Sequence, residues 1–299
     1  MVEERTSKKP DVAAVIVTFR PNLDRLKQLL AAVDRQVRIS IVVDNGSPPE
    51  TVQQMRQFLA ASQHLIALEE NRGIAAAQNM GLTYARDQHS DHVLLLDQDS
   101  APSDGMVGRL LSHCLTLADS GRKVGAVGPS LADERWKSEQ RLKPKGREQD
   151  VKNLLEVDHI IASGSMIPLA VIDAVGALME ELFIDYVDIE WCLRASRHGY
   201  PSFIATDVVM DHQLGAPMKV LGRVISTHSP MRHYYMVRNT IWLVRQPWLP
   251  ARWRYGKVPK IALHLLINAV FARPHSQHWR MMLRGLRHGL SGQMGKGHE

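Results

Sequence analysis

The hydrophobic positions of the first hundred residues follow two alternating patterns. Continuous runs of β-branched and aliphatic residues are typical of strands buried on both faces, and they occupy residues 12–19, 39–44, 64–68 and 93–97. Between these runs, apolar residues recur at helical spacing. Strands that alternate with helices predict an α/β fold with a mostly parallel central sheet, flanked by helices and joined by right-handed crossovers.

Polar residues mark where the intervening helices begin. Asn22 is expected to cap the first helix, and in the stretch SPPE we expect Ser47 to cap the second, with proline in its first turn. The turn NRG at 71–73 precedes a third predicted helix over residues 74–87. These start signals agree with the apolar spacing that follows each of them.

The chain beyond residue 130 is less regular. Residues 131–158 are highly charged and weakly patterned, which is typical of a solvated loop; a mobile loop beside an acceptor is the alternative. Strand character returns over 157–168. A helix is predicted over 183–200, with Asp185 as its cap, and a further strand over 203–212.

The composition is that of a globular protein. The 299 residues are 44% hydrophobic and 23% charged, and no window is long and apolar enough to span a membrane. Residues 1–10 are charged and lack the apolar centre of a signal peptide, so we expect a disordered tail. Two distant cysteines make no metal spacing or disulfide framework, and a reducing cytoplasm is the expected location.

The net charge of +6 is unevenly distributed, because no acidic residue lies between Asp211 and Glu299. Residues 241–299 instead combine arginines and lysines with four tryptophans and an apolar helical stripe over 257–271. This predicts a basic, amphipathic helical extension that associates peripherally with the anionic inner face of the cytoplasmic membrane. The alternative is a cap that packs on the rest of the chain or on a second copy in a homo-oligomer.

Polar residues cluster where the predicted strands end. Thr18, Asp44, Asn71, Asp97 and Asp99 all fall at or just beyond carboxyl ends, where open parallel sheets bind ligands. Asp97 and Asp99 are separated by one residue, so their side chains point to the same side of an extended chain and can converge on one point. Two converging carboxylates favour Mg²⁺ or Mn²⁺. The plainer interpretation is that one of them caps the next helix while the other faces solvent.

Four further features allow both a chemical and a structural interpretation. Asp44 suits the N–H of a nucleobase or an Asx turn, and NRGIAAAQN (71–79) suits close approach of a phosphate or sugar, or a tight helix–sheet contact. The acidic residues of FIDYVDIE (183–190) include a candidate general base, although all of them suit a helix start. His212 is a candidate third metal ligand or a structural histidine.

The ordered set VIVTF, VVDNGS, NRGIAAAQN, LLLDQDS, ASGSMI, FIDYVDIEWCLRA and VVMDH resembles the family 2 inverting glycosyltransferases with the GT-A fold, and specifically bacterial rhamnosyltransferase-like members. The likeness runs from about residue 12 to residue 239. It implies a GT-A catalytic domain over 11–240, with a nucleotide-binding half at about 11–130 and an acceptor half at about 157–240. Residues 241–299 then form the basic helical extension.

The resemblance also implies residue roles. Asp188 matches the catalytic base, and Asp99 the direct metal ligand, with Asp97 and His212 completing the metal site. The acceptor site would contain Glu190, Asp185 and Trp191. Donor-binding residues would be Thr18, Asp44, Arg72, Asn79, Asp97, Ser163, Gly164 and Arg238.

The implied reaction is metal-dependent transfer of L-rhamnose from dTDP-L-rhamnose, with inversion, to a hydroxyl of a cell-surface glycan or a lipid-linked acceptor. Within the same class, the alternative is a donor of another kind, a sugar linked to UDP or GDP. A nucleotidyltransferase is a further alternative among enzymes, but this sequence lacks the glycine- and lysine-rich loop that such enzymes usually have near the first strand. Outside enzymes, the alternative is a basic nucleic-acid-binding protein. We do not expect nucleic acid as a partner, because no recognition module accompanies the basic residues and the strand ends are acidic.

Overall fold

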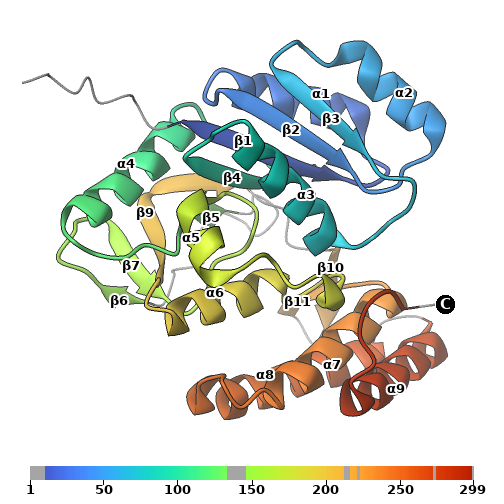
Figure 1. The fold of residues 1–299 in the computed structure, drawn as a ribbon. Coiled ribbons are helices and arrows are strands. Elements are labelled where there is room, and N and C mark those ends of the chain that lie inside the picture. The colour runs from blue at the N-terminus through green and yellow to red at the C-terminus, as the bar shows by residue number, and fades with distance from the viewer. Residues whose placement is uncertain (1–10, 133–145, 212–215, 221–222, 272–273, 298–299) are drawn as a thin grey trace, which may run out of the picture.

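The computed structural model describes residues 11–132, 146–211, 216–220, 223–271 and 274–297. Within these ranges, one mixed sheet forms the centre of the molecule and helices cover both of its faces (Figure 1). Its strands are β1 (Val12–Thr18), β2 (Ile39–Asp44), β3 (Gln63–Ala67), β4 (His92–Asp97), β5 (Ala126–Ala132), β6 (Arg147–Glu148), β7 (Leu154–Val157), β8 (Ser165–Pro168) and β9 (Ser202–Asp211). A separate hairpin pairs β10 (Ala216–Val220) with β11 (Arg223–Thr227).

The strand order is β3-β2-β1-β4-β8-β5-β9-β7-β6. The four strands predicted from the apolar runs are parallel to one another, as expected for buried strands linked by helical crossovers. β8 is antiparallel to both β4 and β5, so the sheet becomes mixed in its second half. The mostly parallel α/β prediction is thus confirmed.

Alternate side chains of the strands enter two separate cores, because successive residues of a strand point to opposite faces. On β1, Val12, Ala14 and Ile16 pack with α1, α2 and α4, whereas Ala13, Val15 and Val17 pack with α3, α5 and α6. The helices are α1 (Leu23–Asp34), α2 (Pro49–Phe58), α3 (Ile74–Asp87), α4 (Met106–Asp119), α5 (Leu169–Val175), η2 (Glu180–Leu182), α6 (Val187–Arg197), α7 (Pro230–Val244), α8 (Ala251–Phe271) and α9 (His275–Ser291).

The helix starts follow the sequence signals only in part. Asn22 caps α1, accepting hydrogen bonds from two backbone amides. The prediction for Ser47 was wrong: α2 begins at Pro49 after Pro48, and the Ser47 hydroxyl donates to Asp44 instead. The prediction that Asp185 caps the next helix was also wrong, because Tyr186 precedes α6 in a left-handed conformation.

The charged segment at 131–158 is not wholly a loop. Residues 131–132 end β5, and residues 146–158 contribute β6 and β7, which extend the sheet beyond β9. Residues 133–145 lie outside the described residues. Strand character predicted for 157–168 is confined to its two ends, since β7 stops at Val157 and β8 begins at Ser165.

The C-terminal helices gather at one end of the molecule beside α6 (Figure 1). Leu193 of α6, Leu243 of α7 and Trp253 of α8 form a small third core with Leu249. The helix α9 packs closely on α7, because an added Cβ at Gly285 would lie 2.5 Å from the carbonyl oxygen of Tyr234. The extension is therefore helical, and its inner side is packed on the rest of the chain.

Candidate active site

The register of the sheet brings the predicted site residues together. Thr18 at the end of β1 pairs with Asp44 at the end of β2, and Val17 pairs with Asp97 at the end of β4. The chain runs outward from β1 to β3 on one side and continues with β4 on the other, so the strand order reverses between β1 and β4. Such a switch point opens a crevice outside the carboxyl ends of the strands, which is where α/β sheets bind ligands.

A chain of hydrogen bonds links the end of β4 to the start of α6. The Asp97 amide donates to the Ser100 hydroxyl at 2.9 Å, and that hydroxyl lies 2.6 Å from the Ser163 hydroxyl. One residue earlier, the Ala162 amide donates to Oδ2 of Asp188 at 3.3 Å. The loop at 162–164 therefore connects the end of β4, at Asp97, with Asp188 at the start of α6, although the two residues are far apart in sequence.

The surroundings of Asp188 raise the pKa of its carboxyl group. Burial raises its pKa to about 6, although the backbone amides of Ile189 and Ala162 lower it by donating to its two oxygens. The negative charges of Asp185 and Asp97 raise the pKa further. The residue as a whole remains partly exposed to solvent. It is thus ionised at neutral pH and more basic than an ordinary aspartate, as a general base requires.

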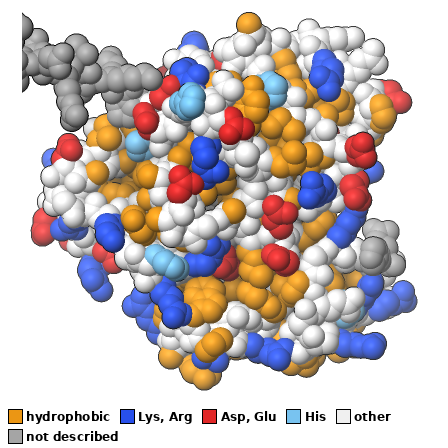
Figure 2. All heavy atoms as spheres, viewed as in Figure 1, with side chains coloured by type: hydrophobic (Ala, Val, Ile, Leu, Met, Phe, Trp, Pro, Cys, Tyr) orange, Lys and Arg blue, Asp and Glu red, His pale blue; other side chains and the backbone are white. Residues whose placement is uncertain are grey.

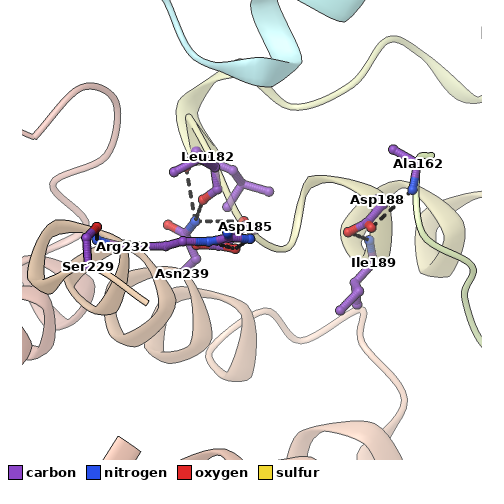
Figure 3. A network of polar contacts seen from close by, with 9 residues as sticks. Ala162, Leu182, Asp185, Asp188, Ile189, Ser229, Arg232 and Asn239 are labelled. Atoms are coloured by element: carbon purple, nitrogen blue, oxygen red, sulfur yellow. Dashed lines mark hydrogen bonds and ion pairs between the residues drawn. The ribbon is translucent and has the colours of Figure 1, made fainter. Parts of the chain in front are cut away.

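The turn that leads into Asp188 is anchored by α7 (Figure 3). Arg232 donates to both carboxylate oxygens of Asp185, with Nη2 to Oδ1 at 3.0 Å. The amide of Asn239 donates to the carbonyls of Leu182, Ile184 and Asp185. These contacts hold a turn whose non-glycine residues at 183, 185 and 186 have positive φ angles, a conformation that costs free energy unless its surroundings fix it.

Asp185 itself is largely buried, and its carboxylate faces α7. Burial raises the pKa of Asp185, and the charge and hydrogen bonds of Arg232 oppose this effect. The ion pair leaves 13% of the Asp185 side chain exposed, against 43% for Arg232. In this arrangement Asp185 secures the turn beside Asp188.

Asp44 is buried among hydrogen-bond donors at the end of β2. Its Oδ1 accepts hydrogen bonds from the hydroxyls of Thr18, at 2.8 Å, and Ser47, at 2.7 Å, and its Oδ2 accepts from the Ser47 amide. Thr18 and Asp44 are both fully buried. The pair supports the loop after β2, next to which Arg20 donates its amide to Ser47.

The loop before α3 lies beside the loop that follows Asp44. The Asn45 side chain binds this loop: its amide group donates to the side-chain oxygen of Asn71, and its oxygen accepts from the backbone amide of Arg72. The side chain of Arg72 itself is exposed. Gly73, with a φ of 92°, lets the chain pass the backbone of Phe183, where an added Cβ would lie 2.7 Å from the carbonyl oxygen. The glycine of NRG thus serves contact with the turn before α6, and Ile74 donates its amide to the same carbonyl.

Four predicted site residues have side chains bonded to neighbouring segments of the fold, and of these Asn79 is only partly buried. The list is Glu190, paired with Arg194 at 2.8 Å; Trp191, donating to the Gly176 carbonyl; Asn79, bonded to Leu178 and Glu180; and Arg238, donating to the carbonyls of Glu181, Leu182 and Gly295. Glu190, Trp191 and Arg238 are almost fully buried. The structure does not bring these four side chains into the group formed around Asp97 and Asp188.

The remaining predictions concern the metal site and the loop that faces it. Gly164, with a φ of 85°, closes the loop that carries Ser163, and its amide donates to Leu95. Asp99 is exposed just beyond β4. His212 lies outside the described residues, but the residue before it, Asp211, pairs with Ala101, two residues after Asp99.

No group of three His, Cys, Asp or Glu side chains suited to a metal ion occurs in the described part of the chain. The two carboxylates of Asp97 and Asp99 are nevertheless the oxygen ligands that Mg²⁺ and Mn²⁺ prefer. They also lie at the switch point, where a ligand phosphate would meet them. The residues present therefore fit a hard divalent cation.

Three residues that shape this site carry no recognisable signal of their own in the sequence. Ser100, Arg232 and Asn239 act through contacts with segments 47 to 63 residues away. Arg232 and Asn239 fall in a stretch of basic and aromatic residues that spacing alone assigns to no site. Only the docking of α7 against the turn before α6 reveals their function.

The sheet order, with acidic groups at its switch point, is that of the GT-A fold. Two solved structures share this fold: S. aureus TarS, with a TM-score of 0.58 and 14% identity, and GalNAc-T7 with UDP, GalNAc and Mn²⁺, with a TM-score of 0.59 and 12% identity. Each match covers 95% of this chain, which spans 49% and 56% of the length of those two chains.

The chain belongs to glycosyl transferase family 2, whose sequence model matches residues 14–176. It is 30% identical over 295 residues to a dTDP-rhamnosyl transferase, RfbF of Shigella flexneri, with 96% of this chain and 98% of the relative covered. It is also 29% identical over 199 residues to the hexosyltransferase Agl10 of Haloferax volcanii, which covers 62% of each chain. The resemblance found in the motifs is therefore confirmed, and the protein is a glycosyltransferase.

Proposed function

We propose that this glycosyltransferase moves L-rhamnose from dTDP-L-rhamnose to a hydroxyl of a cell-surface glycan or lipid-linked acceptor, with inversion at the anomeric carbon. The observation that carries the chemical part of the proposal is the partly exposed Asp188, with its pKa raised to about 6, beside the acidic end of β4. The donor is proposed from the likeness to the Shigella flexneri relative along nearly the whole chain.

In this mechanism Asp188 removes the proton of the acceptor hydroxyl as that oxygen attacks the sugar. The two backbone amides on its oxygens fix the direction of the carboxylate, so the base need not reorganise during the reaction. Attack from the side opposite the leaving diphosphate inverts the anomeric carbon. The anchored turn at 183–186 sets the position of Asp188 relative to the sheet.

The donor occupies the crevice between β1 and β4 in this proposal. Asp97 and Asp99, with His212, would hold a Mg²⁺ or Mn²⁺ ion, and such an ion would supply positive charge against the negative charge that builds up on the departing diphosphate. The exposed side chain of Arg72 supplies a further positive charge on the same edge of the sheet. Asp44 and Thr18, which are fully buried, would support the nucleoside end from beneath, while Ser163 and Gly164 would lie under the sugar.

The donor site that we propose does not use Asn79 or Arg238, whose side chains hold the turn at 178–182. Likewise, Glu190 and Trp191 support α6 from the interior, and Asp185 acts on the acceptor side through the turn that it anchors. We place the enzyme in the cytoplasm, at the inner face of the membrane; its two cysteines are buried free thiols, which suits a reducing compartment.

A panel of nucleotide sugars tests the donor. The full chain is mixed with dTDP-L-rhamnose, or with UDP- and GDP-linked sugars, in Mn²⁺, in Mg²⁺ or in excess chelator, and thermal stabilisation and slow donor hydrolysis are measured. We expect the largest stabilisation and hydrolysis with dTDP-L-rhamnose, and a loss of both with chelator. Preference for a UDP or GDP sugar would overturn the donor assignment, and an undiminished response in chelator would overturn the metal assignment.

A further inference from the structure

The exposed large hydrophobic side chains are concentrated on two helices. Nine of the ten in the described residues lie on α8 and α9, the exception being Phe19. On α9, Trp279, Leu283, Leu286 and Leu290 recur at intervals of four, three and four residues, so they form one stripe along the helix. Their exposed fractions range from 38% to 59%, which is unusual for four side chains of this kind in a row.

The stripe of α9 continues onto α8. Leu266 of α8 and Trp279, Leu283 and Leu286 of α9 line one apolar groove of about 270 Å³, which Val237 and Ile241 of α7 also line. Leu263 and Val270 extend the surface along α8, with exposed fractions of 58% and 51%. We call this continuous surface, from Leu263 to Leu290, the apolar face.

The exposed stripe of α9 is not the surface through which this helix packs on the rest of the chain. A neighbouring side of α9 is packed on α7 through Gly285 and Gly289, and an added Cβ at Gly289 would lie 2.7 Å from the Arg238 carbonyl oxygen. Trp253 is buried in the small core between α6 and the C-terminal helices, with Trp248 packed against that core. The extension therefore both caps the catalytic domain and presents hydrophobic side chains outward.

The apolar face is set in a region of one charge sign. Residues 251–291 contain eight lysines and arginines and no aspartate or glutamate. Arg280 and Arg287 of α9 are exposed beside the leucine stripe. Figure 2 shows hydrophobic side chains at the lower end of the molecule bordered by lysines and arginines, whereas the acidic side chains lie farther up.

This combination selects the partner. A second copy would bring the same basic rim against itself, because a two-fold interface pairs identical surfaces and like charges repel. Nucleic acid would meet the arginines but leave the leucines in water. An anionic bilayer satisfies both, since it accepts leucine and tryptophan at the acyl boundary while its headgroups attract arginine.

We infer that the apolar face binds the surface of an anionic lipid bilayer, with α8 and α9 lying in its plane. The inference deepens the proposed function and rests on it only for the acceptor. Since α7 joins the apolar face to the turn at Asp185 through Arg232, docking here holds the acceptor side of the active site next to the membrane. A lipid-linked acceptor would then reach Asp188 from the bilayer.

Vesicle co-sedimentation of the full chain tests the inference. Phosphatidylglycerol vesicles are compared with phosphatidylcholine vesicles, using wild type, R280E/R287E, L263Q/L283Q/L290Q and the control R25E/R56E, which makes the same charge change on α1 and α2. All the substituted side chains are exposed, so we expect each variant to fold, and circular dichroism checks this. We expect binding only to phosphatidylglycerol, weakened about tenfold or more in both α8–α9 variants and unchanged in the control.

Equal weakening in the two charge variants would overturn the inference, because general attraction of a basic protein would explain it. Equal binding of wild type and the leucine variant would overturn it as well. A dimer of the wild type that the leucine variant dissociates would assign the face to a second copy. Donor hydrolysis in vesicle-free buffer is measured alongside: it reports on the proposed function, and its failure leaves the vesicle result intact.

Discussion

The substitution Asp188→Asn removes the charge of the proposed base while keeping its shape. Two opposing effects on stability follow from the structure. One pKa unit corresponds to about 1.4 kcal/mol, so a carboxylate whose pKa burial raises from 3.8 to about 6 costs up to about 3 kcal/mol when ionised, and the amide avoids this cost. The amide also turns its NH₂ toward one of two backbone N–H groups, at a cost of about 1–3 kcal/mol.

These effects separate with pH. A carboxyl group with a raised pKa in the folded protein destabilises it progressively as pH rises from the unfolded to the folded pKa, here from 3.8 to about 6. The variant lacks this titration. Its stability relative to wild type should therefore increase by as much as about 3 kcal/mol between acid and neutral pH, with the two proteins within about 2 kcal/mol of each other at neutral pH.

The effect on catalysis should be much larger. Loss of a general base lowers rates by about 10²–10⁴-fold, and wild-type activity itself should rise with pH through about 6 as Asp188 ionises. Nucleoside diphosphate release in the presence of acceptor measures transfer, and thermal stabilisation by the donor measures binding, which we expect to be unchanged. Asp119→Asn, an exposed carboxylate on α4, is the control and should leave every measurement unaltered.

Denaturant unfolding of the wild type and Asp188→Asn at acid and neutral pH completes the assay. Transfer above a tenth of the wild-type rate would refute the assignment of the base. A stability difference that does not change with pH would refute the reasoning about burial, because it would mean that Asp188 titrates alike in the folded and unfolded chain.

Four further substitutions test the metal site, the turn before Asp188 and the packing of the C-terminal helices. Asp99→Asn should weaken Mn²⁺ binding, measured by calorimetry, about tenfold or more, and unchanged affinity would remove Asp99 from the metal site. Arg232→Gln leaves the largely buried Asp185 carboxylate without its ion pair and should cost about 1–3 kcal/mol in denaturant unfolding. Gly285→Ala places a methyl group 2.5 Å from a carbonyl oxygen of α7 and should lower the free energy of unfolding by about 1–3 kcal/mol. Gly256→Ala on α8 has open space around it and should raise the free energy of unfolding by up to about 1 kcal/mol. Equal effects of the two alanines would show that the α7–α9 contact yields without strain.

The sequence pattern was most informative where local and long-range demands agree. In residues 12–97, the apolar runs that form β1, β2 and β4 are buried in the sheet between helices, whereas β3, at the edge of the sheet, is only partly buried. The spacing of hydrophobic residues therefore contains most of this part of the fold. The same pattern predicted that Thr18, Asp44 and Asp97 share an edge, because parallel strands end together, and the register confirms this. The direct α1 cap at Asn22 is another signal of this local kind.

The sequence by itself therefore determined the α/β sheet, the family motifs and the acidic pair at the switch point. Only the tertiary structure decided which polar residues support the fold and which face solvent. The family resemblance placed Glu190 and Arg238 in the site, yet both lie in the interior, while Arg232 carries no sequence signal and anchors the turn before Asp188. The physical reason is that a side chain's burial, partners and pKa depend on segments that pack against it from elsewhere in the chain. Spacing along one helix or strand contains no record of those neighbours.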